Sequence, residues 1–331
     1  MVDVARAAGV SVATVSHVLN ETRAVRPATR DAVREAIDEC GYIHNTLARS
    51  LVTSRTRSIG VAISVISNPY FTEILQGIEQ EAVEHGYTLL FADPRDEPGH
   101  EFDVVSSLHQ RRVDGVIVAA SAEPDRTVCY LSEHGVPTVF ADRLVSERHD
   151  QVCAENTEPT ARLVDHFAAA GHDRIGFVAG IEGLSTTTER LAGYREGLRR
   201  NGIDEVPQLC GWGGSAVETA RTAAESMLDL AQPPTAIITG NNAMTIGTMR
   251  GMRERGRRIP EDVALAVFDD FPWADLFAPR LSAIAQPSRE IGAEAVRLLL
   301  GRLDEPDRPV ETRRLESQFQ HRESCGCGQD R

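Results

Sequence analysis

Apolar residues are spaced differently on the two sides of residue 60. Before it, short segments of helical period are separated by Gly and polar residues, which predicts a small all-α head. After it, apolar runs typical of buried strands alternate with helix-period segments up to about residue 300, which predicts an α/β fold with parallel sheets. The candidate strands are 59–65, 88–91, 115–119, 137–141, 175–179, 236–239 and 263–268, and in the second half helices are expected around 157–170, 188–200, 216–230 and 243–256.

The head is predicted to contain three helices. Gly9 breaks the first helix, and Ser11 is placed to cap the second, which ends near Asn20. The third begins at Pro27 and stops at Gly41, because Pro suits the first helical turn and Gly the position after the last. The apolar side chains expected to lock the helices together are Val10, Val15, Val18 and Leu19.

Composition and charge narrow the classes of protein. With 41% hydrophobic and 25% charged residues, neither disorder nor a membrane protein is indicated, and 331 residues suffice for two or three cores. The net charge of −14 argues against a nucleic-acid partner for the chain as a whole. Residues 1–57, however, hold eight Arg against six acidic residues, so only the head could approach a phosphate backbone without net repulsion.

Cysteine usage and the first residues indicate a reducing compartment. The N-terminus lacks the basic-then-apolar order of a secretory signal, which predicts a cytoplasmic location, and we expect no structural disulfide among the six cysteines. Cys325 and Cys327 make a poor zinc site without a third ligand nearby. We therefore expect no metal and no cofactor, and residues 325–331 are expected to form a disordered tail.

The segment 4–20 has the helix, glycine turn and helix of a helix-turn-helix. An ordinary helical hairpin shows the same pattern, so the spacing alone does not decide between them. The residues themselves resemble the lac repressor family of transcription regulators. The matching positions are 3–5, 8–11, 14–16, 18–20, 29–30, 41–42 and 48–51.

This resemblance implies roles for residues of the second helix. Val12, Ala13 and His17 would read bases, and phosphates would be held by Ser11, Thr14, Ser16, Asn20 and Asn45. Val12 and Ala13 have no hydrogen-bonding group and could contact only an apolar feature such as a thymine methyl, whereas His17 can donate or accept at a purine edge. His17 is therefore the main specificity candidate, and its alternative is a solvated helix residue.

The resemblance also implies a hinge helix at Asn45 to Val52 that inserts into the minor groove. Ala48 and Leu51 would form its wedge, because an apolar side chain pushed between base pairs kinks the duplex. The alternative is that Leu51 is buried against the rest of the protein.

Beyond the hinge the resemblance continues to about residue 324 and implies a two-lobed core like that of periplasmic sugar-binding proteins. Three strand crossings are expected near 155–157, 284–286 and 313–316. The expected parts are a helix-turn-helix head at 1–43, a hinge and linker at 44–57, an N-terminal lobe at 58–155 plus 287–314, a C-terminal lobe at 156–286 plus 315–324, and the tail.

A ligand would bind between the lobes, beyond the carboxyl ends of the strands. By resemblance Tyr70 and Phe71 lie against a ligand ring, Arg190 binds its oxygens, and Asn241 and Asp269 complete the set. Such groups suit a sugar, which presents hydroxyls over a partly apolar ring face. The weaker candidates are Asp142, Thr186, Trp212 and Gln286.

Structural roles stay open for several of these side chains. Arg190 and Asp269 could form an ion pair, Phe71 could belong to the core, and Trp212 could anchor a loop. Leu184 stands where purine-sensing members of the family carry an Arg, which argues against a purine ligand.

The function predicted is a ligand-controlled repressor that binds palindromic operator DNA as a homodimer, with a tetramer left open and no membrane partner. Its effector is expected to be a sugar, with a nucleoside or another metabolite as the alternative. An enzyme is disfavoured because no P-loop, dinucleotide motif or nucleophile elbow occurs, so no catalytic residue is assigned. A transport-type solute-binding protein would have a signal peptide and no helix-turn-helix.

Overall fold

The computed structural model describes residues 1–20, 23–42, 55–64 and 70–327, and the chain divides into two compact units at Thr56. We call residues 1–56 the head and residues 57–331 the core. Each unit has its own hydrophobic interior.

The head consists of three short helices, α1 (Val2–Ala7), α2 (Val12–Asn20) and α3 (Pro27–Glu39). Their interior is built on Val4, Val15 and Val33, which are all fully buried. Of the four side chains predicted to lock the helices, Val15 is thus in the interior, and the partly buried Val10, Val18 and Leu19 pack against it. Gly9 has a φ of +63°, so the turn between α1 and α2 adopts the left-handed conformation that Gly favours. The predicted helix-turn-helix is therefore present.

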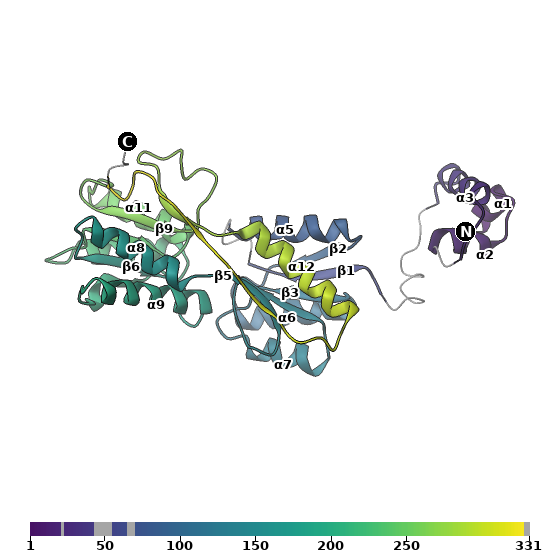
Figure 1. Ribbon diagram of the computed structural model, residues 1–331, viewed down its shortest axis with the longest axis horizontal. Helices are drawn as coiled ribbons and strands as arrows, with labels where there is room; N and C mark the ends of the chain where they lie inside the picture. Colours follow the sequence, from purple (N-terminus) through teal and green to yellow (C-terminus); the bar gives the residue numbers. More distant parts are fainter. Residues whose placement is uncertain (21–22, 43–54, 65–69, 328–331) are drawn as a thin grey trace. The chain divides into compact units, whose positions relative to one another are not determined.

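The core contains two six-stranded sheets, each flanked by helices (Figure 1). In the first, all neighbours are parallel and the order is β11-β5-β4-β3-β1-β2. We call this sheet with its helices lobe 1. Its elements are β1 (Ser58–Ala62), α5 (Tyr70–Glu84), β2 (Thr88–Ala92), α6 (Pro98–Gln110), β3 (Gly115–Val118), α7 (Asp125–Glu133), β4 (Thr138–Ala141), β5 (Asp150–Ala154), α12 (Ser288–Asp304) and β11 (Thr312–Leu315).

The second sheet has the order β12-β10-β9-β8-β6-β7, and all its pairs are parallel except β10 with β12. We call this sheet with its helices lobe 2. Its elements are α8 (Thr157–Ala169), β6 (Ile175–Ala179), α9 (Ser185–Arg200), β7 (Cys210–Trp212), α10 (Val217–Leu228), β8 (Ala236–Thr239), α11 (Asn242–Glu254), β9 (Ala264–Phe268), β10 (Ser282–Ala285) and β12 (Gln318–Gln320).

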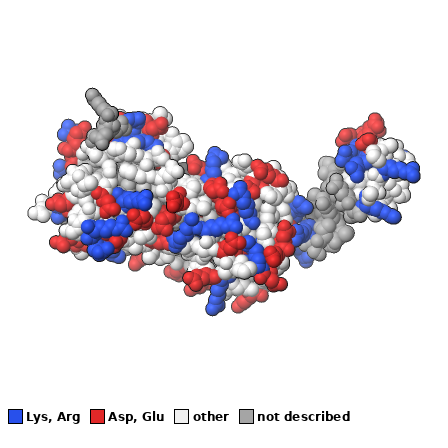
Figure 2. Space-filling view, viewed as in Figure 1, with Lys and Arg blue, Asp and Glu red and all other residues white. Residues whose placement is uncertain are grey.

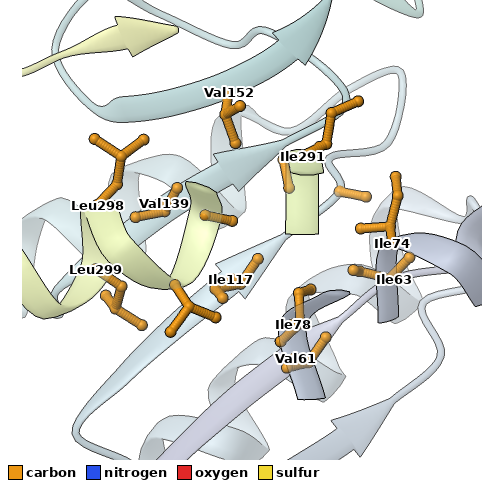
Figure 3. Packing of buried hydrophobic residues seen from close by; sticks show 14 of the residues in the cluster. Val61, Ile63, Ile74, Ile78, Ile117, Val139, Val152, Ile291, Leu298 and Leu299 are labelled. Atoms are coloured by element: carbon orange, nitrogen blue, oxygen red, sulfur yellow. The ribbon is translucent and has the colours of Figure 1, made fainter. Parts of the chain in front are cut away.

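Helices cover both faces of each sheet, which explains why the central strands, such as β3, β4, β8 and β9, are apolar on both sides. In lobe 1, Ile74 and Ile78 of α5 and Ile291 of α12 pack on strand residues such as Ile117, and Figure 3 shows this cluster. The two helices touch through their backbones: a Cβ added at Gly77 would collide with the Arg289 carbonyl, and one at Gly292 with that of Ile74. A separate cluster from α6 and α7 covers the opposite face.

The chain passes from one lobe to the other at residues 155–156, 286–287 and 316–317. These passages connect β5 to α8, β10 to α12 and β11 to β12. The last passage places β11 in lobe 1 up to Leu315, one residue beyond the boundary expected at 314. Five strands lie where the sequence pattern predicted none, namely β5, β7, β10, β11 and β12; for β10 and β11 the resemblance had implied only crossings nearby. In β5, Asp150 and Gln151 are polar yet buried, because Arg302 and backbone groups satisfy them, so the strand lacks an apolar signature.

The expectation of a disordered tail is wrong for residues 325–327. Cys325 is completely buried and belongs to the hydrophobic cluster of lobe 2, and Cys327 packs against the same cluster.

On the face of the core seen in Figure 2, acidic and basic side chains are intermixed. Among the described residues they form many ion pairs, such as Arg297 with Glu81 and Arg200 with Glu158.

Candidate functional site

Two loop residues in the core share an unusual backbone conformation. Asp142 follows β4 of lobe 1 and Asp269 follows β9 of lobe 2, and their φ angles are +71° and +72°. Non-glycine residues seldom adopt this left-handed conformation, and such residues concentrate at functional sites. Both carboxylates are buried, and both line one cavity with residues from both lobes.

On the lobe 1 side, the Tyr70 hydroxyl donates to Asp142 Oδ1 at 2.8 Å and lies 3.2 Å from Gln286 Oε1. Burial and the nearby carboxylates of Asp142 and Asp269 raise the pKa of Tyr70 well above its ordinary value, so its hydroxyl remains a donor. Burial also raises the pKa of Asp142, although Arg143 and Arg190 favour its ionised form. The Phe71 ring meets that of Tyr70 edge to face at 5.3 Å.

On the lobe 2 side, Arg190 is held by groups that fix its guanidinium plane. Its Nε donates to Asn156 Oδ1 at 2.8 Å, and its Nη1 donates to the Gly240 carbonyl oxygen. The guanidinium lies 3.8 Å from the centre of the Phe268 ring, and Nη2 is 3.9 Å from Asp269 Oδ1. Arg190 therefore presents an oriented cation next to a buried carboxylate.

Gln286 lies on one of the passages between the lobes and bonds to groups from both sides. Its amide nitrogen donates to Asp269 Oδ1, while its oxygen lies near the Tyr70 hydroxyl. The free volume of the cavity is about 30 Å³, room for one or two water molecules. A ligand of sugar size would therefore require the lobes to separate or these side chains to turn outward.

The head presents a second candidate surface, the start of α2. The Ser11 hydroxyl caps this helix by accepting a hydrogen bond from the Thr14 amide at 3.1 Å. Ser11, Val12 and Ala13 are exposed there, while Val15 points into the interior of the head. One turn later, His17 is partly exposed.

Comparisons with known proteins give the same two parts. A family model described as bacterial regulatory proteins, lacI family, matches residues 1–45, and one for periplasmic binding protein-like domains matches residues 164–325. The HTH-type transcriptional repressor PurR of Vibrio atlanticus (strain LGP32) is 33% identical over 307 residues, which cover 92% of either chain. The chain belongs to the lacI family of bacterial regulatory proteins.

Solved structures of lacI family members share the whole fold. The lac repressor dimer bound to operator and the anti-inducer ONPF matches with a TM-score of 0.86 at 28% identity, covering 98% of both chains. The regulator CelR in complex with cellobiose matches with a TM-score of 0.76 at 30% identity, covering 97% of this chain and 98% of that one. The predicted family and fold class are thus confirmed, and the protein is a DNA-binding transcription regulator with a ligand-binding core.

Most ligand candidates from the sequence meet in the cavity of this lacI family core. Tyr70, Phe71, Asp142, Thr186, Arg190, Asn241 and Asp269 line it, and Gln286 bonds to two of them. Asn241 also caps α11, because its side chain accepts from the Met244 amide at 2.9 Å. Trp212 is not brought to this cavity: it ends β7 with 46% of its surface exposed, and Ser215, three residues later, lines the cavity instead.

Besides Ser215, further polar residues of the site were missed, among them Arg143 and Asn156. Arg143 is buried in the lining, where its Nη1 donates to Asp96, and its Nε has no hydrogen-bond partner among the described residues. The signal was available, since an Arg directly after the strand-end Asp142 occupies the same edge of the sheet. Asn156, which orients Arg190, gave no signal because it lies 34 residues away in sequence.

Several positions expected to contact DNA lie outside the described residues. Asn45, Ala48 and Leu51 all fall in 43–54, and the side chain of Asn20 is likewise not described. Their roles stay predictions.

No helix among the described residues is long and apolar enough to cross a membrane.

Proposed function

We propose that this regulator is a repressor whose affinity for a palindromic operator is controlled by a sugar-sized effector bound between the two core lobes. The observation that carries this proposal is the cavity where buried carboxylates from both lobes face the oriented Arg190 and the Tyr70–Phe71 pair. A ligand that contacts both lobes binds the closed arrangement of the lobes more tightly than the open one. This difference in affinity is what allows a ligand to shift the equilibrium between the two arrangements.

A polyol suits this cavity better than a purine. Asp142 and Asp269 can accept hydrogen bonds from hydroxyl groups, Arg190 can donate to hydroxyl oxygens, and the aromatic pair offers an apolar face for a sugar ring. The related regulator CelR was solved with cellobiose, a sugar. Leu184 lines the cavity with a side chain that has no hydrogen-bonding group, so a purine would find no donor at this position.

The proposal of a homodimer is supported by the single helix-turn-helix in the head. One α2 reads one half-site, and a two-fold protein matches a palindrome whose halves lie about one helical turn apart. The related lac repressor was solved as a dimer on its operator. The working location inferred from this activity is the cytoplasm.

A DNA-binding experiment tests the repressor. Full-length protein should shift a palindromic fragment from upstream of its own gene, and binding should weaken steeply as salt rises, because counterions released from phosphates dominate the affinity. A scrambled fragment of equal length is the control. Equal binding to both fragments would contradict sequence-specific recognition.

A thermal-shift screen tests the ligand class. A ligand that binds the native core raises its melting temperature, so monosaccharides, disaccharides and nucleosides should be compared at equal concentration. A shift by nucleosides alone would replace the sugar by the alternative effector class.

His17→Ala should weaken operator binding about tenfold or more and relax the base preference at one symmetric pair of positions. The reason is that a side chain that hydrogen-bonds a base edge contributes on the order of 1–3 kcal/mol of discrimination. Electrophoretic titrations on an operator series with each base substituted would measure it. Non-specific binding of the same variant should be unchanged, and an equal loss on all sequences would show that His17 only supports the head.

Effector affinity should fall as the pH is lowered from neutrality toward about 4, the ordinary pKa of Asp. Burial raises the pKa of Asp142, so this carboxylate gains a proton earlier than an exposed one and loses an acceptor for the ligand. Isothermal titrations at several pH values would show the trend. Asp142→Asn should bind more weakly at neutral pH and show a flatter dependence, and a wild-type affinity that does not change would exclude Asp142 from the ligand contacts.

A further inference from the structure

The C-terminal segment 321–327 is firmly attached to lobe 2. The Ser324 hydroxyl donates to the Leu265 carbonyl at 2.7 Å and accepts from the Ser282 amide at 2.8 Å, while its carbonyl accepts from the Leu265 amide. Two residues earlier, both terminal nitrogens of Arg322 donate hydrogen bonds to the Asp270 carboxylate, each at 2.8 Å. These hydrogen bonds attach the segment to β9 and β10 of lobe 2.

Two thiols and one imidazole of this segment lie close together with a second imidazole, that of His166 in α8. Cys327 Sγ lies 2.7 Å from His166 Nε2, 3.5 Å from His321 Nε2 and 2.9 Å from Cys325 Sγ. His321 Nε2 lies 3.1 Å from Cys325 Sγ, and the four candidate ligand atoms are all within 4.8 Å of one another. Neither the ligand cavity nor the DNA-reading helix includes any of these residues.

The local backbone explains how both thiols come close to the imidazoles. Gly326 between them has a φ of +73°, a conformation that turns the chain and that other residues seldom adopt. His166 stands in the last turn of α8, and its ring packs against Phe319 with centroids 5.1 Å apart. Cys325 is completely buried, whereas His321 is exposed, so the cluster lies at the surface of lobe 2 with one ligand in its interior.

We propose that His166, His321, Cys325 and Cys327 form a structural zinc site. Zn²⁺ prefers four sulfur and nitrogen ligands in a tetrahedron, with Zn–S of about 2.3 Å and Zn–N of about 2.0–2.1 Å. Such a tetrahedron has edges of roughly 3.3–3.8 Å. Four of the six separations, at 2.7–3.5 Å, are slightly shorter, and the other two lie within 4.8 Å, so shifts of about an ångström or less would bring the four atoms to this geometry.

This assignment corrects the expectation that Cys325 and Cys327 lack a nearby third ligand. His321 precedes Cys325 by four residues, so three ligands occur within seven residues, and the fold brings His166 from 155 residues upstream. On binding, each thiol releases its proton to the buffer and both imidazoles bind as neutral groups. The ion then ties the end of α8 to the chain that follows β12 and closes lobe 2 at its C-terminus.

The test uses the full-length protein, purified in reductant, with metal content measured by mass spectrometry. We expect one zinc per chain, and we expect Co²⁺ substitution to give tetrahedral d–d bands with thiolate-to-cobalt charge transfer. Cys327→Ser and His321→Gln replace two ligands that, unlike Cys325, are not completely buried, and each should weaken zinc binding by about 100-fold or more. Cys129→Ser, an exposed thiol on α7 of lobe 1, is the matched control and should retain the metal.

Thermal unfolding gives a second readout. Chelation should lower the melting temperature of the wild type and of Cys129→Ser, and leave that of Cys327→Ser unchanged, because only the first two have zinc to lose. A wild-type chain that binds no zinc would overturn the proposal. Equal zinc in Cys327→Ser, or a Cys325–Cys327 disulfide that persists in reductant, would overturn it as well. None of these measurements depends on the operator or the effector.

Discussion

Arg190→Ala is expected to lower effector affinity by roughly 100-fold while the protein still binds its operator. The substitution removes a cation that is oriented by Asn156 and Gly240 and that lies 3.9 Å from the Asp269 carboxylate in the cavity lining. Hydrogen bonds to charged groups contribute about 1.5–3 kcal/mol each, and a ligand oxygen would lose at least one. Isothermal titration with the effector found by the thermal screen measures the loss, and titration of the operator without effector measures DNA binding.

A matched control for this experiment lies on the same helix. Arg195 is also part of α9, but its side chain is half exposed and pairs with Glu205 away from the cavity. Arg195→Ala should leave effector affinity unchanged, because it alters the charge of α9 without touching the site. If both variants lose affinity equally, the effect comes from the charge or stability of the helix and Arg190 is not a ligand contact. If Arg190→Ala responds normally, Arg190 serves only as an ion-pair partner of Asp269.

The sequence predicted those parts of the site that follow strand ends or match family positions. Asp142 and Asp269 are such residues, because parallel strands carry their carboxyl-end loops to one edge of a sheet. Trp212 was misplaced because the glycines around it leave the register of the loop undefined, and Ser215 reaches the cavity instead. Asn156 could not be predicted, since its contact with Arg190 depends on how the passage between the lobes meets α9.

The C-terminus shows a different limit of sequence reasoning. A short polar and cysteine-containing ending is typical of a tail, yet Cys325, the first residue assigned to the tail, is completely buried, like Ser324 before it. Their burial depends on β9 and β10 offering backbone partners to Ser324, and those strands lie some 40 to 60 residues earlier. Long-range contacts of this kind have no periodic signature along the chain.

The same kind of long-range contact should make Asp150→Asn strongly destabilising. Asp150 begins β5 and is 2% exposed, and its carboxylate accepts from Arg302 at 2.9 Å and from the Glu311 amide at 2.9 Å. Arg308 lies 3.3 Å from it. Since β11 begins at Thr312, directly after Glu311, these contacts position the start of β11 beside β5. After β11 the chain passes into lobe 2.

Removing the charge of Asp150 leaves Arg302 partly buried without its counter-ion, so we expect a loss of about 3 kcal/mol in the free energy of unfolding of the core. Urea titrations should show a lower midpoint with an unchanged slope. Asp229→Asn, which breaks an exposed pair with Arg255, is the control and should leave the midpoint unchanged. Equal effects of the two substitutions would mean that burial adds nothing to the Asp150 contacts.

The pH dependence of this variant separates charge from packing. Burial opposes ionisation of Asp150, but hydrogen bonds from Arg302 and the Glu311 amide outweigh it and lower its pKa below the ordinary value. A lowered pKa means that the stabilisation is fully present above about pH 4, the pKa of Asp in an unfolded chain, and is lost as the pH falls through the folded-state pKa. The difference between wild type and Asp150→Asn should therefore be constant near neutrality and shrink at the lowest pH at which both remain folded. A difference that stays constant with pH would show that shape, rather than charge, fastens β5 to the segment entering β11.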